Sequence, residues 1–139
     1  MIVFLDANIL FSAALPGNLT GWFIGVLFDR ARCITNAYAV EEARRNLETK
    51  TAKTLSQLHV LLEQCDLVGG IGFMSETIKL KAKEMPILGG AIDGQATHLL
   101  TGDERDFGEL FGKTIQGVKI VSPRMLAEEM VKLGWLEKQ

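Results

Sequence analysis

The stretch MIVFLDANIL, residues 1–10, runs from four apolar residues straight into an acid. Ile2 to Leu5 form a short unbroken apolar run, which is typical of a strand buried on both faces of a parallel sheet. Asp6 follows this run with no solvated residue between them. The sequence therefore predicts a carboxylate at the tip of a buried strand, followed by a helix or turn from Asn8 to about Leu15.

The bulk composition is that of a single globular domain spanning residues 1–139. Hydrophobic residues make up 47% of the chain and charged residues 23%, which is ordinary for a folded protein. The net charge of −2 argues against a surface that is positive all over, so a nucleic-acid partner would need a local basic patch. The sequence shows neither an apolar run of about 18 residues nor a secretion leader, so we expect a cytoplasmic protein that does not span a membrane.

Alternation of short β-type runs with helical segments predicts the fold. Parallel strands need long crossover connections, and these are usually helices that cover the faces of the sheet. We therefore expect a three-layer α/β/α sandwich with a central parallel sheet. The expected strands are residues 2–5, 33–36, 97–101 and 118–121, with a possible short strand at 65–68. The expected helices are 19–32, 38–49, 52–64, 75–83, one beginning at Pro86 and one beginning at Pro123, with a helix or turn at 8–15.

The cysteines and histidines are given no chemistry. Cys33 and Cys65 have no metal-ligand spacing around them, so we expect reduced core thiols, with a disulfide as the alternative. His59 lies in a predicted helix beside an apolar run and His98 lies inside a predicted strand. Neither histidine is placed for acid–base catalysis.

Two acids follow predicted strands directly. Asp6 ends the first strand, and Asp103 follows the strand that ends at Thr101. In open parallel sheets ligands gather at the carboxyl ends of the strands, so the two carboxylates are expected to converge there. Carboxylates at one edge repel each other unless a cation compensates them, and Mg²⁺ prefers such oxygen ligands. The alternative is that each acid only caps the helix or turn that follows it.

A third acid is sought on the helix expected over residues 38–49. At about 100° per residue, Glu41 lies on the same side as Arg44 and Arg45, at a spacing where opposite charges pair on a solvated face. Glu42 falls away from that cluster and next to the apolar stripe. Glu42 is thus the candidate ligand at the margin of the core, and an ordinary surface glutamate is the alternative.

Glu84 and Asp93 flank the helix expected to begin at Pro86. Asp93 lies opposite the apolar face of that helix, so it is not a candidate. Glu84 precedes the helix, where the positive end of the helix dipole favours an acid. Metal binding is the second interpretation of Glu84.

Five segments together resemble a PIN-domain nuclease of the VapC toxin type. The most specific features are D-x-N after an apolar strand and T-G-D after a later one. The resemblance covers nearly the whole chain through LDANIL (5–10), EARRNL (42–47), KEMPIL (83–88), HLLTGDERDFGELFG (98–112) and GVKIVSP (117–123).

This resemblance implies a Mg²⁺- or Mn²⁺-dependent endoribonuclease, the toxin half of a bacterial toxin–antitoxin pair. Hydrolysis would be assisted by the metal ion and would need no His or Ser nucleophile. By position, the family's four catalytic and metal-binding acids fall on Asp6, Glu42, Glu84 and Asp103. One departure is that the third acid is usually Asp, whereas Glu84 is one methylene longer.

Neighbours of the four acids are assigned supporting roles by the same resemblance. Asn8 and Thr101 match residues that orient the acids. Asp106 is either an additional acid behind the metal ligands or an exposed turn residue.

Contacts with RNA and protein partners are less well defined by the sequence. Arg44, Arg45 and Arg105 are candidates for binding RNA phosphates, although a solvated charged face explains them equally well. The resemblance implies a small antitoxin as partner and allows a homodimer. Trp22, Phe23 and the GWLEKQ tail (134–139) are either antitoxin-binding surface or core. A non-catalytic PIN-like module that binds nucleic acid or protein is the alternative function, because Glu84 is atypical.

Overall fold

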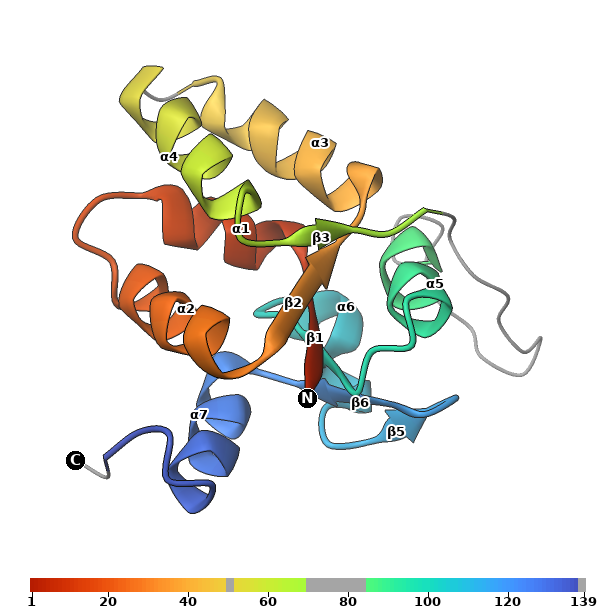
Figure 1. The fold of residues 1–139 in the computed structure, drawn as a ribbon. Coiled ribbons are helices and arrows are strands. Elements are labelled where there is room, and N and C mark those ends of the chain that lie inside the picture. The colour runs from red at the N-terminus through yellow and green to blue at the C-terminus, as the bar shows by residue number, and fades with distance from the viewer. Residues whose placement is uncertain (50–51, 70–84, 138–139) are drawn as a thin grey trace.

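The computed structural model describes residues 1–49, 52–69 and 85–137. The helix expected over residues 75–83 lies outside the described residues. Figure 1 shows strands in the middle of the molecule and helices around them. The elements in chain order are β1 (Ile2–Leu5), α1 (Ala7–Ala14), α2 (Leu19–Arg30), β2 (Arg32–Thr35), α3 (Ala37–Leu47), α4 (Ala52–Leu62), β3 (Asp66–Leu67), α5 (Met85–Asp93), β4 (His98–Leu100), α6 (Glu104–Phe107), the 3₁₀ helix η1 (Gly108–Leu110), β5 (Thr114–Ile115), β6 (Val118–Val121) and α7 (Pro123–Lys132).

The six strands form one sheet in the order β3-β2-β1-β4-β6-β5. Every neighbouring pair is parallel except β5 with β6 at the edge. The chain progresses outward from β1 through β2 to β3, and then returns to the other side of β1 with β4. The direction of progression therefore reverses between β1 and β4, which is where ligands bind in open sheets of this kind.

Both faces of the sheet are covered. Successive side chains of a strand point to opposite faces, and Val3, Phe4 and Leu5 in β1 are all 0% exposed. The strand registers align Phe4 with Ile34 and with Leu99, giving a continuous apolar row on one face. The three-layer α/β/α arrangement predicted from the sequence is therefore confirmed.

Side-chain caps determine where several helices begin. Asn18 accepts a hydrogen bond from the N–H of Thr20 at the start of α2, and Asn36 accepts one from the N–H of Ala39 at the start of α3. Ser122 caps α7, whose first residue is Pro123, as predicted. Such caps satisfy backbone donors that have no partner inside the helix.

The hairpin that joins β5 and β6 was not predicted. Its two-residue turn holds Gln116 at φ 48° and Gly117 at φ 86°. Positive φ at both central residues is the backbone of a type I′ turn, which matches the twist of an antiparallel pair. The strand β5 has only two residues, too few to give an alternating pattern in the sequence.

Several side chains differ in burial from simple expectation. Phe23 is buried in the core, but Trp22 is 57% exposed, so core packing was the wrong interpretation for Trp22. The thiols of Cys33 and Cys65 are both free, as expected, and burial raises the pKa of each to about 12. Among the described helices none is long and apolar enough to cross a membrane alone; α1 and α2 reach that standard only together, with a bend of 111° between them.

Candidate active site

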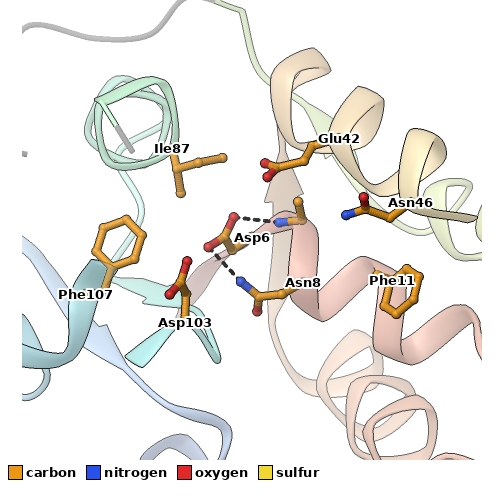
Figure 2. A pocket seen from close by; sticks show the side chains of 9 residues that line it. Asp6, Asn8, Phe11, Glu42, Asn46, Ile87, Asp103 and Phe107 are labelled. Atoms are coloured by element: carbon orange, nitrogen blue, oxygen red, sulfur yellow. Dashed lines mark hydrogen bonds between the residues drawn. The ribbon is translucent and has the colours of Figure 1, made fainter. Parts of the chain in front are cut away.

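A cavity of about 140 Å³ lies at the carboxyl ends of β1 and β4. Three of the predicted acids line it: Asp6 after β1, Asp103 after β4 and Glu42 on α3. Figure 2 shows these carboxylates and the side chain of Asn8 around one hollow. The convergence expected from the strand ends is therefore present in the structure.

Asp6 is held by a network of hydrogen bonds. Its Oδ1 accepts from the N–H of Ala7 at 2.6 Å, so Asp6 also caps α1. Its Oδ2 accepts from Thr101 Oγ1 at 2.8 Å and from Asn8 Nδ2 at 3.1 Å. The cap and the convergence with Asp103 thus occur together rather than as alternatives.

Asn8 and Thr101 connect the two strand ends to each other. Asn8 Nδ2 lies 3.3 Å from Thr101 Oγ1, while Asn8 Oδ1 accepts from the N–H of Gly102 at 2.8 Å. Thr101 Oγ1 also accepts from the N–H of Asp103 at 3.1 Å. Both residues therefore fix the position of the Asp6 carboxylate relative to Asp103, consistent with the orienting role expected for them.

Burial raises the pKa of Asp6 from 3.8 to about 6. The carboxylate is only 4% exposed, and the hydrogen bonds from Thr101, Ala7 and Asn8 offset part of the cost of desolvating it. The negative charge of Glu42 acts in the same direction as burial. A cation in the pocket would oppose both effects, because an opposite charge favours the ionised carboxylate.

Asp103 caps the short helix α6 as well as lining the cavity. Its Oδ1 accepts from the N–H of Asp106 at 3.0 Å. Asp106 is half-buried rather than exposed, so the interpretation of it as an exposed turn residue was wrong. Its backbone holds Asp103 in place, and a further role of its carboxylate stays a prediction.

The two glutamates on α3 separate as the helical spacing predicted. Glu42 is half-buried and lines the cavity. Glu41 faces away and pairs with Arg44, whose hydrogen bond lowers the pKa of Glu41. Arg44 also pairs with Glu48, so this candidate for RNA binding already forms ion pairs with two carboxylates.

Arg45 and Arg105 are the other two predicted RNA contacts. Both are exposed, Arg45 on α3 and Arg105 on α6 immediately after the cavity residue Asp103. Their roles in binding phosphate stay predictions. Glu84, the fourth predicted acid, lies outside the described residues.

The donor set of the cavity suits a hard divalent cation. Carboxylate and amide oxygens are the ligands that Mg²⁺ and Mn²⁺ prefer, and Mg²⁺ usually binds only one or two carboxylates while keeping several waters. In residues 1–49, 52–69 and 85–137, however, no three acids, histidines or cysteines lie close enough together to hold an ion among themselves.

Five further lining residues were not selected from the sequence: Ala7, Phe11, Asn46, Ile87 and Phe107. Phe107 and Ile87 are buried core residues that form apolar walls. Asn46 follows Glu42 by four residues, and Phe11 follows Asn8 by three, so each shares a helix face with a predicted site residue. This spacing was the signal in the sequence, and it becomes informative only once α1 and α3 are known to pack together.

Neither a family model nor a curated protein matches this sequence. Solved structures do match it: VapBC2 from Rickettsia felis, bound to a promoter DNA fragment, contains a chain with a TM-score of 0.62 and 15% identity. That match covers 88% of this chain and 98% of that chain.

Two other complexes agree with the first. A chain of VapBC-1 from nontypeable Haemophilus influenzae gives a TM-score of 0.59 at 12% identity, with 89% of this chain and 99% of that chain covered. A chain of FitAcB from Neisseria gonorrhoeae gives 0.54 at 16% identity, with 88% and 98% covered. Likeness at these identities establishes the architecture, and the chain therefore has the PIN-like fold that its motifs predicted.

Proposed function

We propose that this protein is a Mg²⁺- or Mn²⁺-dependent endoribonuclease. The observation that carries the proposal is the meeting of Asp6, Glu42 and Asp103 at one cavity, from three separate elements of the fold. A bound divalent ion would lower the pKa of a water molecule and stabilise negative charge on the phosphate oxygens. Glu84 is proposed as the fourth acid from the sequence resemblance alone.

The protein's own residues would position the ion and the RNA. Asp6 is the central ligand, because the bonds from Thr101 and Asn8 fix its carboxylate before anything binds. Glu42 and Asp103 would hold the ion directly or through its waters. Arg105 follows Asp103 by two residues, and its guanidinium is exposed. It is therefore a candidate for binding a phosphate of the RNA strand.

The experiment is cleavage of single-stranded RNA by the purified protein, with and without Mg²⁺ or Mn²⁺. We expect cleavage only with the ion, and a loss of roughly 100-fold or more in Asp6→Asn. Asp93→Asn is the matched control, because Asp93 is an exposed acid on α5 that does not line the cavity. Circular dichroism would show that both variants are folded. Intact RNA at every ion concentration with the folded wild type would reject the enzyme.

A non-catalytic binding module is the second candidate. It is favoured by the absence, among the described residues, of three ligand side chains close enough to enclose an ion. It predicts that RNA binds without being cut and that Asp6→Asn leaves binding unchanged. The same cleavage series, run beside an electrophoretic binding assay, separates the two functions.

We also propose that the protein acts in the cytoplasm as the toxin of a toxin–antitoxin pair. The structures similar to it are VapBC and Fit complexes, which supports a protein partner. Expression of the wild type is expected to stop bacterial growth, and Asp6→Asn is expected to relieve that arrest. Normal growth with abundant wild-type protein would contradict the toxin role.

A further inference from the structure

The active-site cavity continues beyond its carboxylates, between α1 and α3. Figure 2 shows Phe11 and Asn46 at the end of the pocket away from Asp103 and Phe107. Both residues line the same cavity as Asp6. None of the roles proposed above uses this extension.

Asn46 has a side-chain amide that is available to a ligand. The amide of Asn8 is fully engaged, with its nitrogen near Asp6 and Thr101 and its oxygen accepting from Gly102. The side chain of Asn46, in contrast, is exposed and makes no hydrogen bond to the described part of the chain. It offers one donor group and one acceptor at the wall of the pocket.

Phe11 provides an apolar ring beside that amide. It is half-buried and packs against the core from its position on α1, so its position is fixed while part of the side chain faces the cavity. Phe107, at the other end, is only 1% exposed, so too little of its ring is accessible for a base to stack on it. An aromatic ring next to an unpaired amide is the combination that binds nucleobases: the ring stacks and the amide bonds to the base edge.

We infer that Phe11 and Asn46 bind the base of the nucleotide next to the phosphate that a divalent ion would hold beside Asp6 and Asp103. The inference rests on the proposed function, since it takes RNA as the ligand of this pocket. Stacking on one ring tolerates every base, so Phe11 determines affinity. The amide distinguishes donors from acceptors on the base edge, so Asn46 determines which base is preferred.

Binding is tested with the four ribonucleoside 5′-monophosphates, which contain no internucleotide bond to cut. Each is titrated into the full chain in Mg²⁺ while NMR follows the backbone N–H signal of residue 46, which the wild type and all variants retain. Phe11→Leu, which keeps apolar volume but loses the ring, is expected to weaken all four by about tenfold. Phe11→Tyr keeps the ring and should bind like the wild type. Asn46→Ala should reduce the differences among the four nucleotides to within about twofold.

Cleavage of RNAs that differ only in the base beside the cut site gives the second readout. We expect Asn46→Ala to lose the base preference and Phe11→Leu to raise KM about tenfold for every substrate. Unchanged binding and unchanged preference in both variants would overturn the inference, as would a wild type that binds no nucleotide. If nucleotides bind through these two residues but the wild type cuts no RNA, the base site stands and the nuclease proposal fails.

Discussion

Without a bound metal ion, the buried Asp6 carboxylate destabilises the folded protein when it is ionised. Its pKa is raised from 3.8 to about 6, so the folded state holds the proton more tightly than the unfolded state does. The contribution of protonated Asp6 to the free energy of unfolding is therefore fully present below about pH 4 and is lost as the pH rises through about 6. At neutral pH the ionised carboxylate costs about 3 kcal/mol of stability.

We expect this destabilisation to appear as a pH dependence of the free energy of unfolding measured in urea. In EDTA, the free energy of unfolding of the wild type should fall relative to that of Asp6→Asn between pH 4 and pH 7. Comparing the two proteins removes the contributions of the other titratable groups. Saturating Mg²⁺ should oppose this fall, because a bound cation favours the ionised Asp6 carboxylate in the folded state. Parallel pH profiles in EDTA would mean that Asp6 is not desolvated as described.

Thr101 is expected to act on catalysis through Asp6. Thr101→Val keeps the shape of a fully buried side chain but removes a donor to Asp6 and an acceptor for the N–H of Asp103. Loss of such a supporting bond typically reduces metal affinity or activity by about 10- to 100-fold. The pH at which activity reaches half its maximum should also rise, because the Thr101 bond lowers the pKa of Asp6.

Thr35→Val is the matched control for this measurement. Thr35 is equally buried, but its hydroxyl donates to the backbone oxygen of Leu5 and not to a pocket carboxylate. It should lose a comparable amount of stability while retaining its pH profile. A shifted profile in both variants would indicate a general loosening of the sheet.

At the scale of elements, α5 approaches the start of α3 unusually closely. A Cβ on Gly90 would lie 2.4 Å from Asn36 Nδ2 and 3.2 Å from the Phe4 ring. Asn36 uses that nitrogen to donate to the carbonyl of Pro86, while its oxygen caps α3. Because Gly90 has no side chain, the amide of Asn36 fits between α5, α3 and the sheet and can hydrogen-bond to both helices.

Gly90→Ala is expected to destabilise the fold by about 1–3 kcal/mol, because Asn36 must move and overpacking has this typical cost. Gly25→Ala is the matched control: Gly25 lies in α2 and a Cβ there meets nothing within 4 Å. That control should gain up to about 1 kcal/mol, since alanine favours a helix over glycine. Urea unfolding measures both, and a neutral Gly90→Ala would show that α5 can shift without cost.

Element types were predictable where the apolar period was long or a cap was present. The strands β1 and β6 begin and end where the pattern placed them. The helix α7 begins at Pro123 as predicted, and Ser122 with Pro123 gives a local start signal. The helix α2 ends two residues earlier than expected, because Arg32 already pairs with Ile2 in the sheet. Such ends depend on tertiary pairing and cannot be obtained from spacing alone.

At the scale of the whole molecule, the net charge of −2 requires any RNA contact to be local. Arg105→Ala should therefore reduce the dependence of log affinity on log salt by about 0.7 for each lost phosphate contact to a single strand. Arg32→Ala is the control, because Arg32 starts β2 at the opposite end of the sheet and pairs with Asp66. Equal slopes of log affinity against log salt in the wild type and Arg105→Ala would show that Arg105 does not contact an RNA phosphate.

The candidate site divides into a predictable part and an unpredictable part. The convergence of Asp6 and Asp103 follows from a topological rule, and the choice of Glu42 over Glu41 follows from helical angles. The roles of Phe11 and Asn46 depend instead on how α1 packs against α3, which no local pattern encodes. The position of Glu84 stays a prediction.

The bond between Thr101 and Asp6 joins residues that are 95 positions apart in the chain. A nascent chain that has not been extended beyond β4 contains Asp6 and Glu42 but not Thr101 or Asp103. Such a chain holds no assembled pocket, however well its first strands have formed. The cavity can therefore assemble only after most of the chain has been synthesised, and a chain truncated before Thr101 would lack both Asp103 and the hydroxyl that donates to Asp6.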